Sequence, residues 1–150
     1  MSKSKQKSKK IMRAFFDDRN FDKISSFDVN MARVMIADDS DAIRLVLQDI
    51  LSIGNHEIVA EAVNGEEAIT KFSESTPDVL LLDLAMPKKD GLTVLKEIMS
   101  KHPGAKVILI TASDNQNVIN ECLKMGASSF ISKPFDFDHV LKTISETVAK

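Results

Sequence analysis

Short apolar runs alternate along this chain with segments whose apolar residues recur every three or four positions. A short apolar run is typical of a β-strand, and the longer repeat is typical of an amphipathic helix. Strands are predicted over residues 34–37, 58–62, 79–82, 107–110 and 129–132, of which 58–62 alternates between apolar and polar positions, and a helical repeat follows each of them. Five strands that alternate with five helices predict an α/β fold, a doubly wound parallel sheet covered by helices on both faces.

Residues that begin and end helices agree with this pattern. The helical repeat over residues 43–51 is preceded by Ser40 and Asp41, either of which can cap a helix, and Gly54 ends it. We expect the last helix over about residues 136–149. These helix-start and helix-end residues therefore agree with the predicted alternation of strands and helices.

The strand predicted over residues 79–82 is continuously apolar and ends at a single carboxylate, Asp83. Pro87 and Gly91 then mark a loop before the next helical repeat. Ligands of open α/β sheets bind outside the carboxyl ends of the strands, which makes Asp83 a candidate site residue. Considered by itself, Asp83 fits a helix cap or a loop-stabilising aspartate better, so the other strand ends decide its interpretation.

Four of the five predicted strands end in a polar group. Asp38 and Asp39 follow the first strand, Asp83 the third, Thr111 the fourth and Lys133 the fifth. In a parallel sheet all of these residues lie at one edge, where neighbouring carboxylates repel each other by roughly 1 to 4 kcal/mol per pair. A cation would remove that repulsion. Oxygen ligands without histidine or cysteine favour a hard ion, and we expect Mg²⁺.

The same groups suit the transfer of a phosphoryl group. A metal ion would neutralise phosphoryl oxygens, Lys133 would pair with another oxygen, and Thr111 would hydrogen-bond a third. An aspartate can itself be the nucleophile, which gives an acyl phosphate. The sequence has no glycine-rich phosphate loop with a GKS or GKT triplet. A nucleoside triphosphate is therefore not expected as the direct donor.

Charge divides the chain into two parts. The whole chain has a formal net charge of −2, and residues 1–30 hold eight basic and four acidic side chains, which leaves −6 for residues 31–150. We expect residues 1–30 to be a basic N-terminal extension, disordered or partly helical, and residues 31–150 to be one folded domain. Nucleic-acid binding by the extension is a weak alternative, because it lacks arginine-rich or aromatic-interleaved motifs, and no direct DNA binding is expected.

The sequence favours a cytoplasmic protein without a membrane span. No apolar run approaches the roughly 20 residues of a transmembrane helix, and no apolar stretch of a secretory signal follows the N-terminal lysines. The single cysteine, Cys122, cannot form an intramolecular disulfide and fits a helix's apolar face. We expect Cys122 and Met35 in the core, and His56, His102 and His139, which have polar flanks, at the surface.

Residues 31–150 resemble the receiver domain of two-component response regulators, with a layout similar to that of the stand-alone chemotaxis members. The resemblance rests, in chain order, on Asp38-Asp39, Asp83 with Met86-Pro87 and Asp90-Gly91, Thr111-Ala112, Gly126-Ala127 and Lys133-Pro134-Phe135. It implies a flavodoxin-like sheet with strand order 2-1-3-4-5. It also implies that a sensor histidine kinase is the phosphoryl donor.

Carried over by position, the resemblance implies a role for each residue of the metal site. Asp83 is the phosphoacceptor and a Mg²⁺ ligand. Asp39 ligates the ion directly, whereas Asp38 acts mainly through water. The backbone carbonyl of Ala85 supplies a further ligand.

The resemblance also implies the residues that respond to phosphorylation. Thr111 and Lys133 bind the phosphoryl group, and Phe130 takes the place of the switch aromatic. The chain departs from the family here, because Phe130 replaces the tyrosine common in chemotaxis members. Ala85 and Ser113 stand where the family often has longer polar side chains that influence loss of the phosphoryl group.

These observations predict a single-domain response regulator that is phosphorylated on Asp83 and signals through protein contacts in chemotaxis. The expected partners are a sensor histidine kinase and an output protein such as a flagellar motor component or another relay protein. A phosphorelay intermediate or a kinase feedback regulator is the alternative. An aspartate-nucleophile phosphatase fits less well, because that chemistry needs a second aspartate where Ala85 stands. We therefore expect a signalling protein that is not an enzyme.

Overall fold

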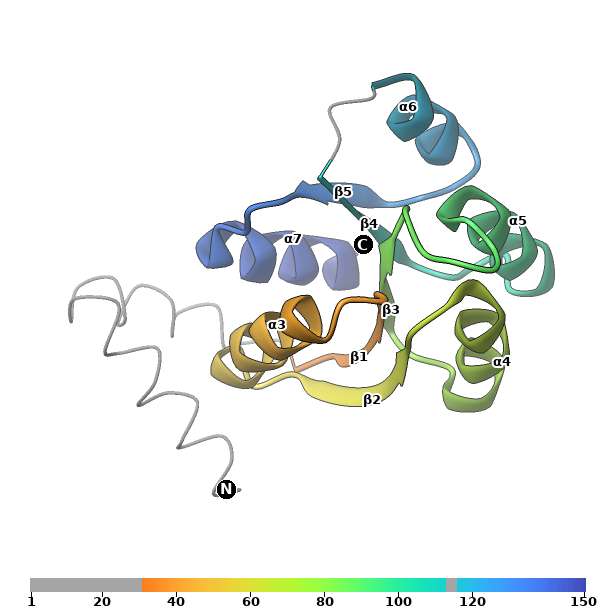
Figure 1. The fold of residues 1–150 in the computed structure, drawn as a ribbon. Helices are drawn as coiled ribbons and strands as arrows, with labels where there is room; N and C mark the ends of the chain where they lie inside the picture. Colours follow the sequence, from red (N-terminus) through yellow and green to blue (C-terminus); the bar gives the residue numbers. More distant parts are fainter. Residues whose placement is uncertain (1–30, 113–115) are drawn as a thin grey trace.

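The structure, a computed structural model, describes residues 31–112 and 116–150. Five parallel strands form one sheet in the order β2-β1-β3-β4-β5 (Figure 1), which confirms the predicted strand order and the flavodoxin-like fold. The predictions made for residues 1–30 and for Ser113 lie outside the described residues.

Strands and helices alternate along the described chain as the apolar pattern predicts. The strands are β1 (Arg33–Ala37), β2 (Glu57–Ala62), β3 (Val79–Asp83), β4 (Val107–Thr111) and β5 (Ser129–Ser132). The helices are α3 (Asp41–Ile53), α4 (Gly65–Ser75), α5 (Gly91–Lys101), α6 (Gln116–Lys124) and α7 (Phe137–Ala149). None of these helices is long and apolar enough to cross a membrane, and the cytoplasmic location stays a prediction.

Helices cover both faces of the sheet: α3 and α7 lie on one face, and α4, α5 and α6 lie on the other (Figure 1). Strand β1 shows how one strand serves two cores. Val34 and Ile36 belong to the core under α3 and α7, whereas Met35 and Ala37 belong to the core under the other three helices. Met35 and Cys122 are fully buried, as predicted. Burial on both faces explains why the inner strands read as continuous apolar runs.

The register of the sheet aligns the carboxyl ends of four strands. Asp83 lies opposite Ile110 in the pairing of β3 with β4, and Thr111 lies opposite Ser132 in the pairing of β4 with β5. Strand β3 pairs with β1 along its other edge, so β3 lies between β1 and β4. The residues that follow β1 and β5 and those that end β3 and β4 therefore meet at one edge of the sheet.

Two helix caps fix the chain next to this edge. The Ser40 hydroxyl accepts a hydrogen bond from the Ile43 amide at 3.2 Å, so Ser40, rather than Asp41, caps α3. Asp90 caps α5 by accepting a 2.8 Å hydrogen bond from the Thr93 amide. Helix α3 starts four residues after β1 ends, whereas α5 starts eight residues after β3 ends, and in both cases the cap holds the end of the connecting loop.

The expectation that all three histidines lie at the surface is wrong for His56. His56 is only 7% exposed, whereas His139 is exposed and His102 is half-buried. The His56 Nδ1 atom accepts a 3.0 Å hydrogen bond from the Ala32 amide, because the residue before β2 lies beside the start of β1. Local polarity gives no sign of this contact, which the pairing of β1 with β2 creates.

Candidate functional site

The aspartates at the ends of β1 and β3 form one cluster. Asp38, Asp39 and Asp83 each offer a carboxylate oxygen, and these atoms lie within 4.8 Å of one another. Asp38 and Asp83 are buried, whereas Asp39 is exposed. The structure therefore brings together the three carboxylates that the sequence places at strand ends.

Lys133, which follows β5, completes the cluster with a positive charge. Its Nζ lies 3.5 Å from Oδ2 of Asp38 and 3.9 Å from Oδ1 of Asp83. The Lys133 amide donates a 2.9 Å hydrogen bond to the Thr111 carbonyl, which holds the ends of β4 and β5 together. One ammonium against three carboxylates leaves the site with an excess of negative charge.

The hydrogen bonding of Asp38 indicates what the site can hold. Its Oδ1 accepts a 2.8 Å hydrogen bond from the Ser40 amide, whereas its buried Oδ2 accepts none from the described residues. The Lys133 ammonium, at 3.5 Å, faces this buried oxygen, but one positive charge does not balance the three carboxylates of the cluster. Three carboxylates and no nitrogen or sulfur ligand in the cluster fit a hard divalent cation such as Mg²⁺.

The environment of Asp83 makes its carboxylate hard to ionise. Burial raises the pKa of Asp83 above its ordinary value, and the nearby charge of Asp38 raises it further. A hydrogen bond from the Ala85 amide, at 3.1 Å to Oδ1, and the Lys133 charge act in the opposite direction. A bound cation would act in the same direction as Lys133 and favour the charged carboxylate.

A hollow of about 380 Å³ lies over the cluster. It is lined by Asp39, Asp83, Leu84, Ala85, Thr111, Ala112, Val118 and Lys133. The predicted residues Thr111 and Lys133 thus line the same hollow as Asp83. Leu84 and Val118 were not predicted as site residues, because apolar side chains in a loop and on a helix carry no chemical signal in the sequence.

Phe130 lies apart from this hollow. It pairs with Leu109 across β4 and β5, is half-buried, and packs against the core under α4, α5 and α6. It does not line the hollow. Its switch role and the metal-ligand role of the Ala85 carbonyl both stay predictions.

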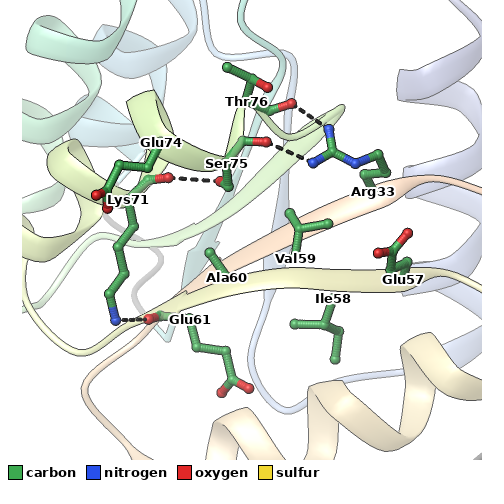
Figure 2. Close-up of a pocket in the computed structure, with 10 residues that line it drawn as sticks. All are labelled: Arg33, Glu57, Ile58, Val59, Ala60, Glu61, Lys71, Glu74, Ser75 and Thr76. Atoms are coloured by element: carbon green, nitrogen blue, oxygen red, sulfur yellow. Dashed lines mark hydrogen bonds between the residues drawn. The ribbon is translucent and has the colours of Figure 1, made fainter.

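A second, larger hollow of about 810 Å³ lies along the edge strand β2 and the end of α4 (Figure 2). Two cations line it, and both contact backbone carbonyls. Arg33 donates to the carbonyls of Ser75 and Thr76, each at 2.8 Å, and Lys71 donates to the Glu61 carbonyl at 2.7 Å. None of the predicted site residues lines this hollow. The predicted site residues lie instead at the carboxyl ends of the strands, around the smaller hollow.

Comparison with known proteins agrees with the geometry. The family model described as response regulator receiver domain matches residues 34–145. The chemotaxis protein CheY of Listeria monocytogenes serovar 1/2a is 41% identical over 116 residues, which are 77% of this chain and 98% of the relative. CheY of Bacillus subtilis (strain 168) is 40% identical over 116 residues, 77% of this chain and 97% of the relative.

Solved structures give the same result. A chain in the crystal structure of the CheX-CheY-BeF3-Mg+2 complex from Borrelia burgdorferi matches with a TM-score of 0.76 and 36% identity. The match covers 79% of this chain and 90% of that chain. The sequence match, the strand order and the acidic cluster agree, and the chain belongs to the response regulator receiver domain family, among its CheY-like chemotaxis members.

Proposed function

We propose that this chain is a single-domain response regulator that accepts a phosphoryl group from a sensor histidine kinase on Asp83. One observation carries the proposal. The Asp83 carboxylate lies at the end of a buried strand, within 4.8 Å of two further aspartates and 3.9 Å from the Lys133 ammonium. A nucleophilic oxygen, a set of cation ligands and a fixed positive charge are the groups that phosphoryl transfer requires.

In this chemistry Asp83 has two roles, as nucleophile and as metal ligand, and each other residue has one. An Asp83 oxygen attacks the phosphorus of the kinase phosphohistidine, the phosphorus–nitrogen bond breaks, and its electron pair stays on the imidazole. Lys133 pairs with a phosphoryl oxygen, and the Thr111 hydroxyl donates a hydrogen bond to another. Asp39, Asp83 and the Ala85 carbonyl would hold Mg²⁺ directly, and Asp38 would hold it through water. The bound ion supplies neutralisation of the phosphoryl charge.

The output is a change in protein contacts. Helix α6 and strand β5 lie in the chain between Thr111 and Lys133, and α7 follows Lys133. Movement of these two phosphoryl-binding residues would therefore bias the surface that the three elements form. Thr111 moves towards the phosphoryl group, and Phe130 packs further inward. The Borrelia relative, crystallised with CheX, BeF3 and Mg, supports both metal binding and signalling by protein contact. For this chain we propose a chemotaxis output, such as a flagellar motor component.

Other roles of the same chemistry are less well supported. A phosphorelay intermediate or a kinase feedback regulator would use the same site with a different partner. A phosphatase would need a second carboxylate two residues after the nucleophile, and Ala85 stands there. We therefore propose a signalling protein that catalyses only its own phosphorylation and dephosphorylation.

Phosphorylation of purified protein tests the proposal. Incubation with Mg²⁺ and acetyl phosphate, or with a phosphorylated kinase, should add one phosphoryl group that hydroxylamine removes. Asp83→Asn should abolish the addition, whereas Glu57→Gln, an exposed carboxylate in the hollow along β2, should leave it unchanged. An equal addition to the Asp83 variant would contradict the assignment.

A further inference from the structure

Arg44, in the first turn of α3, contacts the backbone of Asp38, one of the three aspartates of the acidic cluster. Its side chain is only 12% exposed. One terminal nitrogen donates a 2.6 Å hydrogen bond to the Asp38 carbonyl, and the other contacts Asp41. Its Nε lies 3.2 Å from Oε1 of Glu61 on β2. All three nitrogens of the guanidinium group therefore have a partner.

Glu61, the β2 partner of Arg44, is itself fixed from two helices. Gln48 of α3 donates to both carboxylate oxygens, each at 3.0 Å. Lys71 of α4 donates to the Glu61 carbonyl at 2.7 Å. Figure 2 shows the Glu61 carboxylate pointing away from Lys71, towards the opposite face of β2. Arg44 thus connects the Asp38 carbonyl to a residue of β2 that also accepts hydrogen bonds from α3 and α4.

The Asp38 carbonyl decides where Asp39 lies. The peptide bond is planar, so the direction of this carbonyl sets the plane from which the Asp39 backbone continues. The Asp38 amide donates to the Ala62 carbonyl at 3.0 Å, and its Oδ1 accepts from the Ser40 amide at 2.8 Å. The Arg44 hydrogen bond holds the Asp38 carbonyl, whereas Oδ2 of Asp38 accepts no hydrogen bond from the described residues. Its loss would free the peptide between the two aspartates.

We propose that Arg44 is a positioning residue for Mg²⁺ binding, and that Glu61 holds it in place. The inference rests on the proposed function. In this inference the Arg44 guanidinium group orients the peptide between Asp38 and Asp39. Groups that orient metal ligands from outside the coordination shell change metal affinity by roughly ten- to hundredfold.

A purely electrostatic role makes the opposite prediction. Arg44 carries a positive charge near three carboxylates, so removing that charge would by itself strengthen the binding of a cation. Arg44→Met removes the charge and the hydrogen bonds together. Arg44→Lys keeps the charge, but a single ammonium cannot reproduce the planar fork that reaches three partners. The two variants therefore separate positioning from charge.

Arg33 supplies a matched control. It also donates two hydrogen bonds to backbone carbonyls, those of Ser75 and Thr76, at the opposite end of the strands (Figure 2). Arg33→Met and Arg33→Lys should lower the melting temperature without changing the Mg²⁺ affinity of the folded protein. They show what the loss of an arginine–carbonyl contact does when the contact serves only the fold.

The experiment is a MgCl₂ titration followed by NMR of backbone amides, at a temperature where every variant is folded. Both Arg44 variants should bind Mg²⁺ roughly ten- to hundredfold more weakly than the wild type. Glu61→Gln, which keeps Arg44 itself, should lose less. The Arg33 variants should match the wild type. If Arg44→Met does not fold, Arg44→Lys and Glu61→Gln still test the inference, because both should bind Mg²⁺ more weakly than the wild type.

Two results would overturn the inference while leaving the proposed function intact. Wild-type affinity in both Arg44 variants would show that the contact is only structural. Tighter binding by Arg44→Met, with unchanged binding by Arg44→Lys, would show that Arg44 acts through its charge. A wild-type protein that binds no Mg²⁺ and accepts no phosphoryl group would remove the proposed function together with this inference.

Discussion

At the scale of single residues, the buried Asp83 carboxylate makes the metal-free fold pH-dependent. Its pKa is raised chiefly by burial, above the ordinary value of 3.8. The folded state then binds a proton more tightly than the unfolded state, so this contribution to stability is present at low pH. It is lost as the pH rises from 3.8 through the raised folded pKa.

Asp83→Asn should therefore increase the free energy of unfolding in metal-free buffer at neutral pH. The difference from the wild type should grow as the pH rises through this window and then become constant. Urea unfolding of both proteins in a chelator, at a series of pH values, measures this difference. A difference that does not change with pH would mean that Asp83 titrates alike in the folded and unfolded states.

Thr76, at the end of α4, carries a local backbone strain. Its φ of 42° and ψ of 64° lie in the left-handed region, which β-branched residues rarely adopt. Thr76→Gly should increase the free energy of unfolding by up to about 1 kcal/mol, after allowance for the greater freedom of glycine in the unfolded chain.

Thr70→Gly is the matched control for Thr76, because Thr70 is exposed within the same helix. This substitution should decrease stability by about a few tenths of a kcal/mol, since glycine is the poorer helix former. Chemical denaturation gives both values. A loss of stability in both variants would argue against strain at Thr76.

At the scale of elements, α5 packs against the loop that follows Asp83. A Cβ atom added to Gly91 would lie 2.6 Å from the Leu84 Cα and 3.0 Å from the Asp83 carbonyl oxygen. Both contacts are with backbone, which cannot rotate out of the way. Gly91→Ala should therefore destabilise the protein by about 1 to 3 kcal/mol and also slow phosphorylation, because it displaces the end of β3.

Gly104, in the loop after α5, provides the comparison, because an added Cβ there meets nothing within 4 Å. Gly104→Ala should leave the melting temperature and the phosphorylation rate close to those of the wild type. Thermal melts and time courses with acetyl phosphate measure both quantities. Equal phosphorylation rates in the two variants would show that α5 does not position the Asp83 loop.

The elements differ in how far the sequence predicts them. Strand β3 is apolar throughout and fully buried, so its sequence pattern was sufficient. Strand β2 pairs with β1 through a register shift between Val34 and Met35, and its residues are mostly half-buried. A register shift arises from the way two strands pair, so the sequence of one strand alone does not predict it. The same dependence explains why the burial of His56 beside Ala32 could not be predicted from its polar flanks.

At the scale of the whole molecule, parallel topology turns distant sequence positions into one site. The alternation of apolar runs and helical repeats predicts that Asp38, Asp83, Thr111 and Lys133 share an edge, and the structure places them there. The sequence of a single helix does not predict the face of the sheet on which that helix packs. Contacts that depend on it, such as that of Arg44 with the Asp38 carbonyl, appear only in the folded structure.

The most direct test of the account identifies the residue that carries the phosphoryl group. Borohydride reduces an aspartyl phosphate to homoserine, and peptide mass spectrometry then locates the change. After incubation with Mg²⁺ and acetyl phosphate, the account predicts homoserine at position 83 alone, and none when a chelator replaces Mg²⁺. Reduction at Asp38 or Asp39, or a Mg²⁺-dependent phosphoryl group that borohydride does not convert, would contradict it.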